Sequence, residues 1–218
     1  MARGWFDVSN PFWHWFSKLL DAGGLSLMFL AGCLPVVTVL PSCIALYDAV
    51  SRGLVNNAGG HYRRFLKTYW QELKRGIPMT ILWELIMLVI LYSHTIVRAG
   101  AETDPHMVYM FPVFLVQFLL YFAILSWLIP LESRYFHRFF QLHVNALRLT
   151  LARLGHTAGN LVVLILGVGL CIWRPVLLIV MPALIAAGQC FFVERVFRKQ
   201  FLQDEEEVFP PGFPQRGN

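Results

Sequence analysis

The sequence predicts an all-α integral membrane protein, a polytopic bundle of five or six membrane-embedded helices with amphipathic helices on the cytoplasmic side. Of its 218 residues, 57% are hydrophobic and 15% aromatic, while only 14% are charged. Soluble domains carry roughly 25% charged residues, so this chain has too few polar side chains to cover a water-facing surface. We expect one membrane domain over residues 1–203. The acidic, proline-rich segment 204–218 is expected to be a disordered tail.

Five apolar stretches supply the predicted membrane helices, at about 25–47, 77–97, 107–131, 158–173 and 175–193. A helix needs about 20 apolar residues to cross a bilayer, and the second and third stretches each meet that length. The fourth and fifth are joined by only a few residues, which predicts a tight helical hairpin.

The N-terminal apolar region contains two prolines, Pro35 and Pro41, with Thr38 between them. Proline lacks a backbone donor and clashes with the preceding helical turn, so the freed carbonyl groups need other partners in a bilayer. Residues 11–55 therefore form either one kinked span or two helices. The charge distribution favours two helices, with an outer-surface turn at 35–42. Pro35, Thr38 and Pro41 are the predicted hinge, with Thr38 hydrogen-bonded locally.

Basic residues in the loops predict the orientation. Lysine and arginine dominate segments 47–76 and 132–157 and the start of the region after 193, which begins with Glu194, Arg195, Arg198 and Lys199, whereas loop 98–106 has one arginine against two acids. The positive-inside rule places the first three on the cytoplasmic side. We therefore expect a multi-pass protein of the cell membrane with a cytoplasmic C-terminus. The same rule explains the net charge of +5 without a nucleic acid partner.

Segment 62–76 has the pattern of an interfacial amphipathic helix, with aromatic and leucine residues recurring at three- and four-residue steps. Its aromatic face is expected in the headgroup region and its basic residues toward anionic lipid, so the bilayer is the first expected partner. The predicted lipid-interface residues are Arg63, Arg64, Lys67, Trp70, Lys74 and Arg75.

A few polar residues are candidates for binding a substrate or partner. Glu84 is the only formally charged residue well inside a predicted span, so it is either a polar anchor or a protonated or interfacial residue. Gln117 and Gln189 are suited to hydrogen bonds between helices. A cytoplasmic cluster that binds phosphate or an acidic partner, or that is a solvated helix face, comprises Arg134, His137, Arg138 and His143.

The sequence contains no pattern of a catalytic or cofactor site. Its four cysteines are widely spaced, without a CxxC pair, and no phosphate-binding loop or nucleophile motif is present. We therefore predict that the protein is not an enzyme and that it has no catalytic residue, no metal and no cofactor. Glu132 together with His137 and His143 would be the remaining candidate groups for a membrane-bound enzyme.

Five segments in order resemble the YesL-like family, small bacterial membrane proteins with a domain of unknown function. They are "NPFWHWFSKLL" (10–20), "LPVVTVLPSCIALYDAV" (34–50), "FLKTYWQELKRG" (65–76), "IPLESRYFHRFF" (129–140) and "MPALIAAGQCFFVERVFRKQF" (181–201). The resemblance implies a helical membrane architecture and a frequent genomic association with carbohydrate ABC transporters. It implies no catalytic residues.

Two functions follow as expectations. The first is a non-enzymatic accessory or regulatory subunit of a carbohydrate ABC importer, with permease subunits as the expected membrane partners. The alternative is an autonomous small-solute transporter or channel that uses the broken first segment and Glu84, because broken helices line substrate sites in transporters. The loop "NALRLTLARLGHTAG" (145–159) lacks the acidic start of the element with which ABC permeases dock on their ATPase, which argues against a permease.

Overall fold

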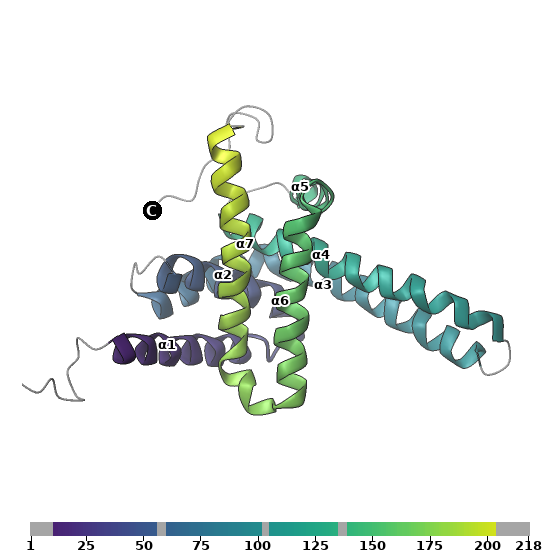
Figure 1. Ribbon diagram of the computed structural model, residues 1–218, viewed down its shortest axis with the longest axis horizontal. Helices are drawn as coiled ribbons and strands as arrows, with labels where there is room; N and C mark the ends of the chain where they lie inside the picture. The colour runs from purple at the N-terminus through teal and green to yellow at the C-terminus, as the bar shows by residue number, and fades with distance from the viewer. Residues whose placement is uncertain (1–10, 56–59, 102–104, 135–138, 204–218) are drawn as a thin grey trace, which may run out of the picture.

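A computed structural model describes residues 11–55, 60–101, 105–134 and 139–203, and these fold into helices and turns without a strand (Figure 1). The α-helices are α1 (Pro11–Gly32), α2 (Val39–Asp48), α3 (His61–Gly100), α4 (Phe111–Arg134), α5 (Phe139–Ala152), α6 (Leu154–Trp173) and α7 (Met181–Gln203). Shorter helical turns are η1 (Val36–Thr38), η2 (Ala49–Val55), η3 (Pro105–Met110) and η4 (Pro175–Ile179). The predicted all-α class is confirmed, and the predicted tail lies outside the described residues.

Within the described part of the chain, three helices are long and apolar enough to cross a membrane: α3, α4 and α6. Helix α3 has 40 residues and is therefore about 60 Å long. It joins the predicted interfacial helix and the predicted second span into one continuous helix that contains Pro78. The first half stays helical because it packs along α2, burying Phe65, Thr68, Glu72 and Gly76.

Helix α2 is the centre of the fold. Eight of its ten residues are buried, and it contributes to both hydrophobic cores. Ile44 and Tyr47 belong to the core that α2 shares with α3, α4, α5 and α7. Ala45 and Leu46 belong to the core that includes α1 and the start of α7. At about 15 Å, α2 is too short to cross a bilayer and is enclosed by longer helices instead.

The helix breaks between α1 and α2, at the residues predicted as a hinge. Helix α1 ends at Gly32, and α2 starts at Val39 with Pro41 in its first turn. The hydroxyl oxygen of Thr38 lies 2.7 Å from the carbonyl oxygens of both Gly32 and Pro35. One hydroxyl hydrogen is therefore shared between two carbonyl groups at the break, and the carbonyl oxygen of Pro35 also accepts the backbone N–H of Thr38, at 2.9 Å.

The position of this break shows that two expectations, a cytoplasmic basic segment 47–76 and an outer-surface turn at 35–42, cannot both hold. A Cβ atom on Gly76 of α3 would lie 2.5 Å from Cγ of Pro41, and one on Gly32 would lie 3.3 Å from the ring of Tyr69. The break thus packs against residues 69–76, which belong to the basic segment that the charge pattern assigns to the cytoplasm. Neighbouring residues cannot lie on opposite sides of a hydrocarbon core about 30 Å thick. A cytoplasmic basic segment is therefore incompatible with an outer-surface turn at 35–42.

The remaining helices form two hairpins that diverge (Figure 1). Residues 81–100 of α3 and 111–122 of α4 extend away from α1 and α2, and we call this pair the arm. Helices α6 and α7 form the second hairpin, as predicted, and run across the direction of the arm. Small residues let α6 and α7 approach closely, because a Cβ atom on Gly159 or Gly188 would lie within 3 Å of Phe192 or Val163.

Candidate functional site

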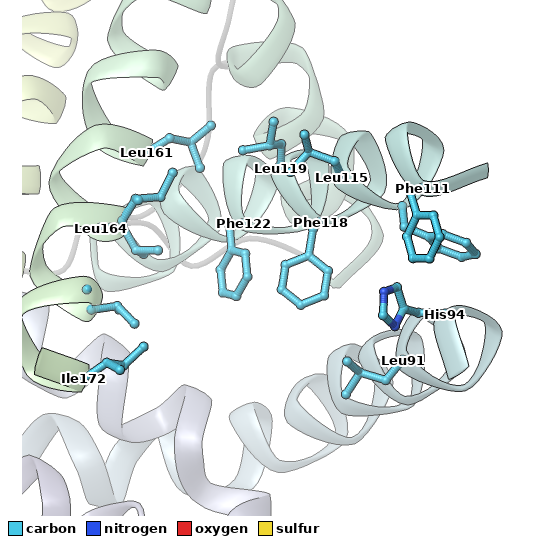
Figure 2. A pocket seen from close by; sticks show the side chains of 14 residues that line it. Leu91, His94, Phe111, Leu115, Phe118, Leu119, Phe122, Leu161, Leu164 and Ile172 are labelled. Atoms are coloured by element: carbon cyan, nitrogen blue, oxygen red, sulfur yellow. The ribbon is translucent and has the colours of Figure 1, made fainter. Parts of the chain in front are cut away.

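An apolar groove of about 790 Å³ opens between the arm and α6 (Figure 2). Phe118 and Phe122 project from α4 into the space between α3 and α6. The lining comprises Leu91 and His94 of α3, Phe111, Phe114, Leu115, Phe118, Leu119 and Phe122 of α4, and Leu161, Leu164, Ile165, Val168, Gly169 and Ile172 of α6. Three helices from two hairpins therefore share one hydrocarbon-lined surface.

Two residues define what this groove can hold. Among the fourteen described residues that line it, His94 is the one with a polar side chain, and its ring packs edge-on against Phe111 and Phe114, with centroids 5.7 and 5.6 Å apart. Gly169 leaves part of the α6 wall bare, because a Cβ atom there would meet nothing within 4 Å. The groove offers space and apolar contact, and hardly any hydrogen-bonding group for a polar solute.

A second feature is a set of charged side chains and one threonine hydroxyl between helices, in which buried acids meet more exposed arginines. We call it the charged junction, and it comprises Asp48, Arg52, Thr68, Arg75, Glu132, Arg134 and Glu194. At one end, the Asp48 carboxylate of α2 lies 3.1 Å from Nε of Arg52 and accepts a 2.8 Å hydrogen bond from the hydroxyl of Thr68 on α3. Asp48 is only 6% exposed. Its charge is therefore balanced by an arginine and a hydroxyl from two different segments.

The other end of the charged junction ties α4 to its neighbours. Nη2 of Arg134 donates a 2.7 Å hydrogen bond to the Glu194 carboxylate of α7. Glu132 is 5% exposed, and its carboxylate lies 4.0 Å from the guanidinium of Arg75 on α3. A partly buried ion pair holds its helices in a fixed register, because separating the partners leaves an uncompensated charge. The ion pairs and the hydrogen bond of the charged junction therefore hold α2, α3, α4 and α7 together.

The three polar residues predicted inside spans lie on three different helices. Glu84 on α3 is half-buried, Gln117 on α4 is exposed and Gln189 on α7 is buried. None of them lines the groove. Their role in binding a substrate or partner therefore stays a prediction.

The predicted cytoplasmic cluster is also divided. His143 stacks on Trp83, and its Nε2 accepts a 3.1 Å hydrogen bond from the indole nitrogen. Its Nδ1 lies 2.8 Å from the carbonyl oxygen of Phe139, so the neutral tautomer protonated at Nδ1 satisfies both contacts. Arg134 instead pairs with Glu194 of α7. His143 thus joins α5 to α3, while His137 and Arg138 lie outside the described residues.

The first half of α3 reverses part of the predicted interfacial arrangement. Phe65 is buried in the core formed with small residues of α2 and η2, so this aromatic ring packs on protein rather than on lipid headgroups. Arg63, Lys67, Trp70 and Lys74 lie on the exposed face. Of the other two predicted lipid-interface residues, Arg64 is half-buried and Arg75 approaches Glu132.

Sequence reasoning missed the charged junction because its acids lie in segments that read as loops. Asp48, Glu132 and Glu194 each stand at the end of an apolar run, where a charge normally marks the return to water. The four-residue spacing of Asp48 and Arg52, which suits an ion pair on one helix, was the available signal. Nothing in the linear pattern links Arg134 to Glu194, which is 60 residues further along the chain.

Comparison with known proteins gives one match. A family model described as "Protein of unknown function, DUF624" matches residues 10–94, which cover α1, α2 and most of α3. No curated protein and no solved structure matches the chain. The part of the chain that contains the helix break and the buried α2 is therefore similar to a protein family whose function is unknown.

Proposed function

We propose that this protein is a non-enzymatic membrane subunit that holds a transmembrane helix of a second membrane protein in the groove between the arm and α6. The observation that carries the proposal is the apolar lining of that groove, contributed by three helices. The resemblance to the YesL-like family supplies the class of partner, the permease subunits of a carbohydrate ABC importer. In this proposal the protein stabilises or regulates the importer.

The groove suits a helix better than it suits a sugar. A site that binds a polar solute places several hydrogen-bonding groups around it, whereas this lining is aromatic and aliphatic apart from His94. An apolar helix presents side chains at three- and four-residue steps that fit between such residues. Membrane helices associate chiefly through packing of this kind, and Gly169 leaves room for close approach.

The alternative, an autonomous small-solute transporter or channel, has less support from the geometry. It requires free carbonyl groups at the helix break and a polar path that includes Glu84. At the break, Thr38 serves the carbonyl groups of Gly32 and Pro35, and the hydroxyl of Ser42 donates to the carbonyl oxygen of Thr38. Glu84 lies on a different helix from the break.

Co-purification from native membranes tests the proposal. Gly169→Leu places a side chain at the groove wall, where nothing lies within 4 Å of the Cβ position. Gly155→Leu is the matched control, since Gly155 has equal space on the same helix and does not line the groove. We expect importer permease subunits to be recovered with the wild type and with Gly155→Leu, and to be lost with Gly169→Leu.

Two results would overturn this proposal. Recovery of the wild-type protein without any transporter component would show that the importer permease is not its partner. Equal recovery of the permease with Gly169→Leu would show that the groove is not the surface that binds it. A flux of sugar or ions through the purified protein in liposomes, altered by Glu84→Gln, would favour the transporter instead.

A further inference from the structure

Gln117 is a polar side chain on the outward surface of an apolar helix. It is the seventh residue of α4, about 9 Å along the axis from the first residue of that helix. Residues 111–131 contain no Asp, Glu, Lys, Arg, His or Asn, so Gln117 holds the one carboxamide of this stretch. The side chain is exposed and makes no hydrogen bond within the described part of the chain.

The surface around Gln117 adjoins the groove on one side only. At about 100° per residue, Val113, Val116 and Leu120 flank Gln117, and these three side chains are between 44% and 62% exposed. On the opposite side, the groove-lining Phe114 and Phe118 lie roughly 60° and 100° from Gln117 around the same helix. Helix α4 therefore presents two adjacent faces, one that lines the groove and one, at Val113, Val116, Gln117 and Leu120, that does not.

A carboxamide in hydrocarbon needs both a donor and an acceptor. Lipid tails supply neither, and an unpaired amide is costly to place among them. In membrane helices this need is met by a polar side chain of another helix. Since the described part of this chain brings no such group to Gln117, a helix from another molecule is the source.

We propose that the Gln117 face of α4 is the interface with a second copy of this chain, related by a two-fold axis. A carboxamide contains two N–H donors and a carbonyl acceptor, so two Gln117 side chains facing each other satisfy one another reciprocally. Two-fold symmetry brings the same residue from the partner to the same depth, which an unrelated helix would have to match by its own sequence. The flanking valines and leucine provide apolar contact, and residues 111–131 of this helix include no charged side chain to repel its symmetry mate.

The first test measures dimerisation of the full-length protein in detergent by analytical ultracentrifugation, over a range of protein-to-detergent ratios. We expect the wild type to dimerise and Gln117→Leu to weaken the dimer about tenfold, the scale of one to two interhelical hydrogen bonds. Leucine suits a lipid-facing position, so this variant keeps its fold. Ser93→Ala is the matched control, because the exposed Ser93 hydroxyl already donates to the carbonyl oxygen of Val89, at 2.8 Å.

The second test locates the interface in native membranes by oxidative cross-linking. Val113→Cys lies on the Gln117 face and should give a covalent dimer above the background of the four native cysteines. Leu115 is also exposed but lines the groove, so Leu115→Cys should not give a covalent dimer. Gly169→Leu should leave the dimer unchanged, which separates this inference from the proposed function.

A wild-type protein that stays monomeric at every ratio would overturn the second-copy interface, as would an unchanged dimer with Gln117→Leu. Cross-linking through Leu115→Cys but not Val113→Cys would also overturn it, because it would place the contact on the other face. If Gln117→Leu instead released a different co-purifying protein from a monomeric chain, the occupant would be a heterologous helix and the two-fold dimer would be wrong.

Discussion

Replacing Gly76 by alanine tests the packing of α2 against α3. The added Cβ atom would lie 2.5 Å from Cγ and 3.0 Å from Cδ of Pro41. Carbon atoms pack at about 3.5–4.0 Å, so the two helices would have to separate by about 1 Å. The proline ring cannot rotate away, and α2 is enclosed on its other sides. Overpacking of this kind costs about 1–3 kcal/mol, and a rigid neighbour favours the upper end of that range.

The helix propensity of alanine opposes this cost. Glycine to alanine inside a helix gains about 1 kcal/mol, so Gly76→Ala should destabilise the fold by roughly 1–2 kcal/mol in total. Gly169→Ala is the matched control, since it makes the same chemical change where a Cβ atom meets nothing within 4 Å. In a chain of this size, 1 kcal/mol shifts the Tm by about 2–4 °C. Thermal unfolding in detergent should therefore show a lower Tm for Gly76→Ala and a slightly higher one for Gly169→Ala. An equal rise for both variants would refute the close approach of Pro41.

Substitutions test three further features by the same unfolding measurement. Thr38→Val should destabilise the protein by about 1–2 kcal/mol because carbonyl groups at the helix break lose their hydroxyl donor, and Thr38→Ser should restore most of the loss. Glu194→Gln and Arg134→Met should each destabilise, with a coupling of about 1 kcal/mol or more in a double-mutant cycle; additive effects would contradict the ion pair. Asn160→Leu should raise the stability, by about 1–3 kcal/mol, because this fully buried amide has no hydrogen-bond partner in the described structure. A lower Tm for that variant would instead indicate a bound polar group.

The sequence was most informative where the signal is local. Two prolines around Thr38 predicted a helix break, and the structure breaks the helix between Gly32 and Val39. The short connection after residue 173 predicted the hairpin of α6 and α7. The same local reasoning divided α3 in two at about residue 77, because basic and apolar segments meet there. One helix can carry both compositions when different neighbours cover its two halves, and that condition is not visible along the chain.

Contacts between residues far apart in the chain could not be predicted in the same way. Glu84 drew attention as an isolated charge in an apolar run, yet it lies apart from the groove. Asp48 read as the start of a polar loop, whereas it is buried with partners on η2 and α3. A charge at the end of an apolar run is compatible with either situation. The choice depends on which helix packs beside it.

By itself, the sequence determined the class of this protein. A chain with 57% hydrophobic and 14% charged residues cannot cover a water-exposed surface, so apolar helices in a bilayer follow from composition alone. Which helix faces are buried, paired or left open depends on the tertiary structure. It enclosed the ten-residue α2, paired charges from helices far apart in the chain, and left an apolar groove between diverging hairpins. Periodicity and loop charge describe one helix at a time, whereas a groove or a buried ion pair exists only through the relative placement of several helices.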